Sequence, residues 1–226
     1  MKLSVIITAG GIGKRMGTDL PKQFLLLHNK PVLMHTIERF YSYHPNFQIV
    51  ITLPGQYIEV WKELCAEYDF SIAHEVVEGG KERYHSIKNA LALTHGELIF
   101  VHDAVRPLVS YETIKSVEKC AIINSAAIPV LPLKESLRKG NENDSQHVDR
   151  SQYWSVQTPQ AFQRSLLVDA YGLPFSNEIT DDASLIERLG EKVYLTTGNE
   201  ENIKLTTPYD MKVAEFLMKN KYANNE

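Results

Sequence analysis

Short apolar runs alternate with segments of helical periodicity, and this alternation limits the folds open to the chain. Apolar, β-branched runs predict strands at 3–8, 48–53, 71–77, 97–102 and 125–131. Amphipathic patterns predict helices between them at 31–43, 56–69, 82–94 and 110–123. Strands that alternate with helices form a parallel sheet with helices on both faces. We therefore expect an α/β fold with a Rossmann-like, mostly parallel twisted sheet.

The pattern changes after Val130. A polar turn at 139–146 separates Leu131–Leu137 from Val148–Val156, which predicts a β-hairpin. Two strands alone are marginally stable in water, so we expect this protruding arm, 131–156, to need a partner. Further helices are predicted at 163–173, 181–189 and 208–221, with a strand at 192–197. The length of 226 residues fits a single domain, 1–226, that carries this arm.

Composition excludes several classes of protein. The formal net charge is −4 and no long basic tract occurs, so we expect no nucleic-acid partner. Gly10 and Gly11 interrupt the first apolar run far short of a membrane span, and we expect no signal peptide and no membrane partner. Cys65 and Cys120 lie in predicted helices and are expected to be inert core thiols of a cytoplasmic protein. Local cations must then hold any anionic substrate.

A glycine-rich loop follows the first predicted strand. Gly10, Gly11 and Gly13 precede Lys14 and Arg15, and Lys22 follows Pro21 a short step later. Glycines let backbone N–H groups close around phosphate oxygens, and the cations supply charge there. The loop matches neither the Walker sequence nor the dinucleotide fingerprint, and the second predicted strand has no acid at its end. It is typical of a nucleotide-binding loop of another kind.

The fourth predicted strand ends in His102-Asp103, followed by Arg106. A carboxylate at a strand end that faces a phosphate loop is well placed to hold Mg²⁺. Alternatively, Asp103 caps the next turn and pairs with Arg106. His102 is expected to pack or orient rather than bind a metal, because no second histidine lies at ligand spacing.

Two glycines and a helix start follow the third predicted strand, at Gly79-Gly80 and Glu82. Backbone amides freed there could read the edge of a base. Because ligands bind at the carboxyl ends of parallel strands, we expect segments 10–23, 79–86 and 102–107 to converge. Arg150 and Lys204 would bring further charge to that site.

These motifs occur in a fixed order along almost the whole chain. The series is A-G-G-x-G-x-R-M, P-K-Q, G-G-x-x-R-x-x-S, H-D-A-x-R-P, V-D-R, T-P-Q, T-D-[DE]-A-S and N-I-K-x-T. In this the sequence resembles the 2-C-methyl-D-erythritol 4-phosphate cytidylyltransferases of the non-mevalonate isoprenoid pathway. The resemblance implies transfer of CMP from CTP to the sugar-alcohol phosphate, with release of pyrophosphate. It also implies a Mg²⁺-dependent homodimer whose arms are exchanged.

The resemblance assigns roles to residues of every motif. It implies that Arg15, Lys22 and Lys204 surround the triphosphate as catalytic residues and that Asp103 holds the metal. The residues implied to contact the nucleotide are Ala9, Gly10, Gly11, Gly13, Gly80, Lys81, Ser86 and Asp103. Those implied to serve the acceptor are Arg106, which supports the Asp103 loop, Ser136 and Arg150 from the partner's arm, and Thr158, Thr180 and Asp181. Ser136 stands where the family often has threonine.

The implied reaction needs no general base, because the acceptor phosphate is already ionised at neutral pH. Fixed cations and Mg²⁺ offset the repulsion between the two anions. Two alternatives stay open: a cytidylyltransferase for another polyol phosphate, such as ribitol 5-phosphate, and a non-catalytic nucleotide sensor on the same fold. The set of Arg15, Lys22, Asp103 and Lys204 argues against a sensor, which has no need of transition-state cations.

Overall fold

Four parallel strands form the part of the central sheet at which the predicted site residues gather. The computed structural model describes residues 1–11 and 20–223. The parallel strands lie in the order β6 (Leu98–Asp103), β1 (Leu3–Thr8), β4 (Gln48–Leu53) and β5 (Glu75–Glu78). Each runs in the same direction, so their carboxyl ends meet at one edge of the sheet.

The other part of the sheet is mixed. β11 (Gln160–Gln163) lies antiparallel between β6 and β7 (Ala126–Pro132). β10 (Trp154–Val156) is antiparallel to the end of β7, and β12 (Tyr194–Thr197) is parallel to it. The sheet as a whole is therefore mixed but mostly parallel, as the sequence predicts.

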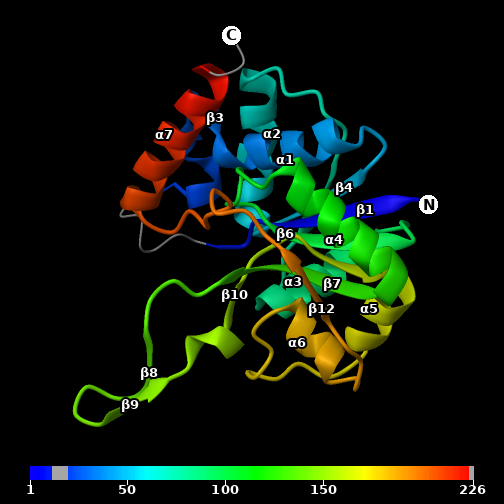
Figure 1. Ribbon diagram of the computed structural model, residues 1–226. Coiled ribbons are helices and arrows are strands. Elements are labelled where there is room, and N and C mark those ends of the chain that lie inside the picture. Colours follow the sequence, from blue (N-terminus) through cyan, green and yellow to red (C-terminus); the bar gives the residue numbers. More distant parts are fainter. Residues whose placement is uncertain (12–19, 224–226) are drawn as a thin grey trace.

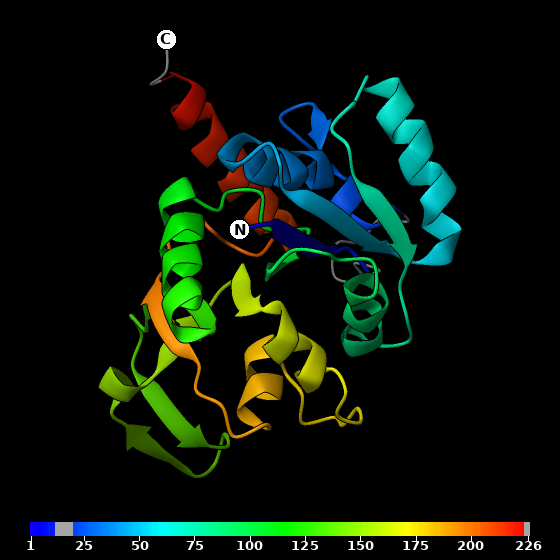
Figure 2. The same cartoon turned by 90° about the vertical axis from the view of Figure 1, so that its right-hand side faces the viewer.

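Helices cover both faces of the sheet (Figures 1 and 2). One face carries α1 (Val32–Tyr43), α2 (Ile58–Glu67) and α4 (Tyr111–Asn124); the other carries α3 (Arg83–Leu91), α5 (Arg164–Ala170) and α6 (Asp182–Glu187). Successive side chains of a strand point to opposite faces, so Val5 and Ile7 join the first core and Ile6 joins the second. Burial on both faces explains why these strands read as continuous apolar runs.

The last helix, α7 (Pro208–Ala223), packs beside the start of α1. It shares a third apolar cluster with the short hairpin of β2 (Leu26–Leu27) and β3 (Lys30–Pro31). Leu205 is buried in this cluster, which fixes the segment that carries Lys204. Within residues 1–11 and 20–223 there are also three short 3₁₀ turns: η2 (Lys22–Phe24), η3 (Gly55–Tyr57) and η4 (Arg150–Gln152).

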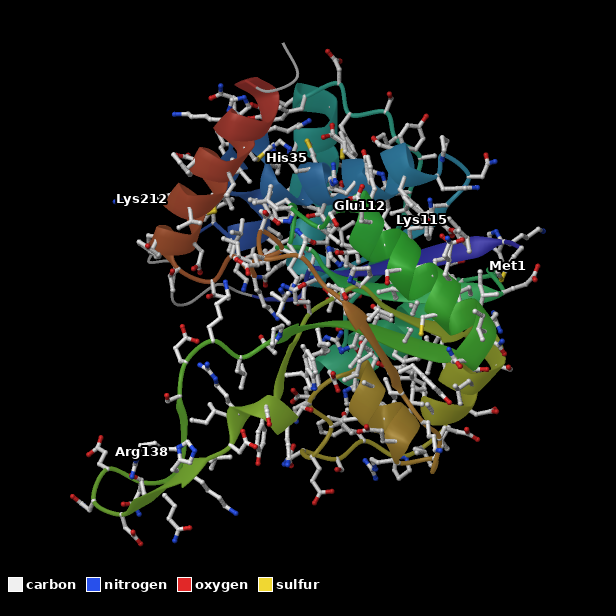
Figure 3. The ribbon with its side chains drawn as sticks, viewed as in Figure 1. Met1, His35, Glu112, Lys115, Arg138 and Lys212 are labelled. Carbon is white, nitrogen blue, oxygen red and sulfur yellow. The ribbon has the colours of Figure 1, made fainter. Side chains whose placement is uncertain are left out.

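A two-stranded hairpin projects from the body (Figure 1). Its strands are β8 (Leu137–Gly140) and β9 (Ser145–Val148), which pair with each other and with no other strand of the described residues. Arg138 donates hydrogen bonds from Nε and Nη2 to the hydroxyl and carbonyl oxygens of Ser145 and so braces the hairpin itself. Figure 3 shows Arg138 far out on this arm, away from the body. The hairpin is shorter than predicted, because the segments before and after it join the main sheet as β7 and β10.

Most predicted elements are found, with differences at particular ends. β5 begins at Glu75 rather than 71, because its pairing with β4 begins there and His74 instead accepts a hydrogen bond from Trp61 Nε1 (3.0 Å). β11 and the β2–β3 hairpin were not predicted. None of the helices in residues 1–11 and 20–223 is long and apolar enough to cross a membrane.

Candidate active site

The carboxyl ends of β1, β4, β5 and β6 surround a cavity of about 480 Å³. Its wall combines residues from all three segments that the sequence predicts to converge: Gly10, Gly11, Lys22, Gly79, Gly80, Lys81, Ser86 and Asp103. Lys204 completes the wall from the segment before α7. The convergence is thus confirmed for the described residues.

In one part of the cavity wall, Lys22 lies against the glycine loop. Gln23 is buried and donates a hydrogen bond from Nε2 to the carbonyl oxygen of Ala9 (2.7 Å), so η2 is tied to the end of β1. This tie places Lys22 along Gly11, where an added Cβ would lie 3.3 Å from Cε of Lys22. A positive charge therefore lies beside exposed backbone, which suits a phosphate chain.

Gly80 and Ser86 form another part of the cavity wall. The backbone N–H of Gly80 donates to Oγ of Ser86 (3.0 Å), and this hydroxyl can donate to the carbonyl oxygen of Glu82 (3.2 Å). A Cβ at Gly80 would come within 2.3 Å of Cβ of His85, so only glycine fits there. This part of the wall holds backbone groups and one hydroxyl in fixed positions, which suits the edge of a planar base.

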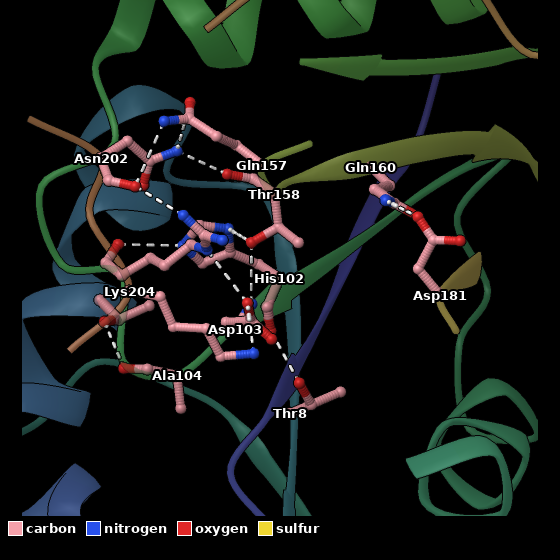
Figure 4. Close-up of polar contacts among 12 residues, drawn as sticks. Thr8, His102, Asp103, Ala104, Gln157, Thr158, Gln160, Asp181, Asn202 and Lys204 are labelled. Atoms are coloured by element: carbon pink, nitrogen blue, oxygen red, sulfur yellow. Dashed lines mark hydrogen bonds and ion pairs between the residues drawn. The ribbon is translucent and has the colours of Figure 1, made fainter. Parts of the chain in front are cut away.

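Asp103 also lines the cavity and is paired with two cations (Figure 4). Its Oδ2 atom is 3.0 Å from Nε of Arg106 and 3.2 Å from Nζ of Lys204. Burial alone would raise the pKa of Asp103, but the charges of Lys204, Arg106 and Arg83 together hold it well below its usual range. Arg106 also donates from Nη1 to the carbonyl oxygen of Asn202 (2.6 Å), behind the cavity wall. The carboxylate therefore stays ionised and fixed.

His102 and Thr158 hold the backbone of Asp103 in place. Burial lowers the pKa of His102 to about 4, so its ring is neutral. Nε2 lies 3.1 Å from the carbonyl oxygen of Arg106, which can only accept, so Nε2 carries the proton. Nδ1 then accepts from the Thr158 hydroxyl (2.9 Å), which itself accepts from the N–H of Asp103 (3.1 Å). This series of hydrogen bonds confirms the prediction that His102 is an orienting residue.

Relatives of the chain share its whole length. The family model described as "IspD: 2-C-methyl-D-erythritol 4-phosphate cytidylyltransferase" matches residues 3–220. The chain belongs to the IspD family. The enzyme of that name from Bacteroides thetaiotaomicron is 49% identical over 219 residues, which are 96% of this chain and 100% of the relative. The chloroplastic enzyme of Oryza sativa is 37% identical over 97% of this chain and 75% of its own.

Solved structures agree with this family. The cytidylyltransferase of that name from Thermus thermophilus superposes with a TM-score of 0.78 at 31% identity, over 97% of this chain and 100% of the other. The bifunctional IspDF protein of Campylobacter jejuni gives a TM-score of 0.80 at 30% identity, over 94% of this chain and 54% of that longer chain.

The residues that the IspD resemblance assigns to the acceptor lie in three different places. Arg106 and Thr158 support Asp103 from behind the cavity wall. Asp181 caps the N-terminus of α6 by accepting from the N–H of Ser184 (2.9 Å), and its other oxygen accepts from Nε2 of Gln160 (2.8 Å). With Thr180, Asp181 lines a second, smaller cavity beside α6.

The arm residues lie away from the cavity of their own chain. Ser136 and Arg150 are exposed, and Arg150 donates from Nη1 to the carbonyl oxygen of Lys134 at the base of the arm. Gly13 and Arg15 lie outside the described residues. Both cysteines are half-buried, and burial raises the pKa of Cys65 to about 11, as an unreactive thiol requires.

Sequence reasoning gave no role to several residues that build this site. Gln23 positions Lys22, and Asn202, fully buried, donates from Nδ2 to the carbonyl oxygen of Thr158 (2.7 Å). Gln23 stands in the motif P-K-Q and Asn202 in the motif N-I-K-x-T, and this position was the signal available in the sequence. Their contacts span 14 and 44 residues of sequence, which no local pattern reveals.

Proposed function

We propose that this chain transfers CMP from CTP to 2-C-methyl-D-erythritol 4-phosphate, giving 4-diphosphocytidyl-2-C-methyl-D-erythritol and pyrophosphate. The observation that carries the proposal is the set of groups that one cavity brings together. Its wall combines the backbone and hydroxyl groups of Gly80 and Ser86, the ionised Asp103 with Lys204, and Lys22 beside Gly11 of the glycine loop. Membership in the IspD family supports the same reaction.

The reaction follows from the charges. An acceptor phosphate oxygen attacks the α-phosphorus of CTP, the bond to the bridging oxygen breaks, and pyrophosphate leaves with that electron pair. Lys22 lies where the phosphates would enter and can neutralise charge that develops on them. Nζ of Lys204 pairs with Asp103. Because 45% of the Lys204 side chain is exposed, its ammonium group can also contact a phosphate oxygen. Arg15 is proposed to join them.

Mg²⁺ is proposed as the cofactor. In residues 1–11 and 20–223, no three His, Cys, Asp or Glu side chains gather into a metal site. Mg²⁺ nevertheless suits a site with one carboxylate when phosphate oxygens and waters supply the other ligands. Asp103 fits this role, because its ionised carboxylate lines the cavity and both cations contact it through Oδ2. When bound, the ion would neutralise negative charge on the triphosphate.

Asp103→Asn tests this metal role. The substitution keeps the shape of the side chain and removes its charge, so the affinity for divalent metal is expected to fall roughly 10–100-fold, with a parallel loss of turnover. Binding of Mn²⁺ to the enzyme–CTP complex, followed by electron paramagnetic resonance, gives a readout independent of activity. Asp169→Asn, which removes an exposed carboxylate on α5, is the control. An unchanged Mn²⁺ affinity in Asp103→Asn would leave this carboxylate only the structural pairing with Arg106.

A homodimer with exchanged arms is proposed to complete the site. The arm, 131–156, extends from a single domain, and its own two strands are only four residues each. Large apolar side chains at its junction with the sheet, Tyr153, Trp154 and Val156, are exposed in the single chain. An arm that crosses a two-fold axis would cover them and carry Ser136 and Arg150 to the acceptor phosphate in the second copy.

The other partners are the small molecules CTP and a sugar-alcohol phosphate. We propose no nucleic-acid and no membrane partner. A cytoplasmic location is proposed, because both substrates are multiply charged phosphates that do not cross a bilayer. Thr158, Thr180 and Asp181 are proposed to shape the acceptor side of the site.

A parallel assay of pyrophosphate release tests the function. The chain is incubated with CTP and Mg²⁺, and with either 2-C-methyl-D-erythritol 4-phosphate or ribitol 5-phosphate. We expect pyrophosphate release to be much faster with the first acceptor. Faster release with ribitol 5-phosphate would change the acceptor, and CTP binding without any release would indicate a nucleotide sensor.

A further inference from the structure

Arg83 belongs to the motif Gly79-Gly80-x-x-Arg83-x-x-Ser86, but the proposed function gives its side chain no ligand to bind. It is the first residue of α3 and lies in the wall between two cavities. Asp103 and Lys204 line the larger cavity. Thr180 lines the smaller one, of about 180 Å³. Arg83 therefore stands where the nucleotide side and the α6 side of the site meet.

A buried carboxylate anchors one edge of the Arg83 guanidinium. Asp182 is fully buried, and its Oδ2 accepts from Nη2 of Arg83 at 2.6 Å. Its Oδ1 accepts from the Tyr171 hydroxyl at 2.5 Å. Burial and the charge of Asp182 raise the pKa of Tyr171, so this hydroxyl keeps its proton and donates. Both oxygens of Asp182 are thus satisfied, and Arg83 is held in one orientation.

The other edge of the guanidinium remains available. Of its nitrogen atoms, Nε and Nη1 have no acceptor among the described residues, and 34% of the Arg83 side chain is exposed. Its charge also acts on Asp103, on the wall where the reaction takes place. An arginine fixed at one edge presents its remaining N–H groups in a defined geometry, and these groups can only donate.

We propose that this second edge of Arg83 binds hydroxyl oxygens of the acceptor's polyol chain and so helps to select the acceptor. The inference rests on the proposed function. The acceptor phosphate must meet the α-phosphate of CTP near Asp103 and Lys22, in the larger cavity. Arg83 lines this cavity and also the smaller one, which contains Thr180 and Asp181, two residues proposed to serve the acceptor. Polyol hydroxyl oxygens can accept hydrogen bonds from Nε and Nη1 of Arg83, which have no acceptor among the described residues.

Arg83→Met and Tyr171→Phe form a matched pair that tests this proposal. Each removes one partner of Asp182, so both are expected to lower the melting temperature. Tyr171 also lines the smaller cavity, but its hydroxyl already donates to Asp182, so only Arg83→Met removes N–H groups that can bind a ligand. Its KM for 2-C-methyl-D-erythritol 4-phosphate is expected to rise roughly 10–100-fold, the effect of losing a hydrogen bond from a charged donor. Its KM for CTP should change little, and Tyr171→Phe should keep both KM values.

Arg83→Lys separates binding from stability. Lysine keeps a positive charge for Asp182, so we expect the melting temperature to recover most of its loss, but it lacks the second edge and the acceptor KM should stay high. A normal acceptor KM in Arg83→Met, or its full rescue in Arg83→Lys, would overturn the proposal. If Arg83→Met does not fold, a normal acceptor KM in Arg83→Lys has the same meaning. Wild-type protein without pyrophosphate release would instead contradict the proposed function itself.

Discussion

Lys22→Ala is expected to lower kcat by roughly 10²–10³, the loss that follows removal of one preorganised donor to developing charge. Gln23 and the glycine loop hold Lys22 beside Gly11 before the substrate binds. The side chain therefore needs little reorganisation during the reaction. Binding of CTP should weaken much less, because the contacts of CTP with Gly80, Ser86 and the backbone of the glycine loop remain. Steady-state kinetics and calorimetric titration with CTP measure the two effects separately.

Lys62→Ala is the matched control for this substitution. Lys62 is exposed on α2, where it pairs with Glu59, and its loss should leave both kcat and CTP affinity unchanged. If Lys22→Ala turned over at a near-normal rate, Lys22 would have no part in stabilising the transition state. A loss of CTP affinity as large as the loss of kcat would make it a ground-state binding residue instead.

Arg150→Ala is expected to be nearly inactive as a homodimer, for a different reason from Lys22→Ala. The proposed arm exchange puts Arg150 of one copy at the acceptor phosphate in the other. Equal amounts of the two variants, refolded together, should form mixed dimers in which one of the two sites is intact. Random pairing of a symmetric dimer then predicts recovery of about a quarter of wild-type activity.

The separately refolded variants, combined only in the assay, are the control for this experiment. They should stay inactive unless the subunits exchange. Native mass spectrometry verifies that mixed dimers have formed. Mixed dimers as inactive as their parents would show that Arg150 acts within its own chain, and a monomeric wild-type protein would exclude the exchanged arm.

The sequence predicts those parts of the fold that depend on local pattern. Buried β-branched runs define β1 and β4 at the predicted bounds, since both faces of these strands are covered. The short antiparallel strand β11 was missed, because its place between β6 and β7 depends on pairing with segments more than thirty residues away. Periodicity over four residues cannot distinguish such a strand from a loop.

The candidate site was predictable to the same extent. Chemical type and position relative to strand ends identify Lys22, Asp103 and Lys204, which the structure gathers in one cavity wall. The sequence could not show that Thr158 spends its hydroxyl on Asp103 and His102. Nor could it pair Arg83 with Asp182, ninety-nine residues later. Such contacts are set by the tertiary fold alone.

Isotope tracing tests the central claim, that an acceptor phosphate oxygen attacks the α-phosphorus of CTP. 2-C-methyl-D-erythritol 4-phosphate carrying ¹⁸O on its phosphate is incubated with unlabelled CTP, Mg²⁺ and the wild-type chain, and the products are analysed by ³¹P nuclear magnetic resonance and mass spectrometry. The account predicts that all of the label appears in 4-diphosphocytidyl-2-C-methyl-D-erythritol and that the released pyrophosphate carries none. Free CMP together with a triphosphorylated acceptor, the products of attack at the β-phosphorus, or label in the pyrophosphate, would contradict it.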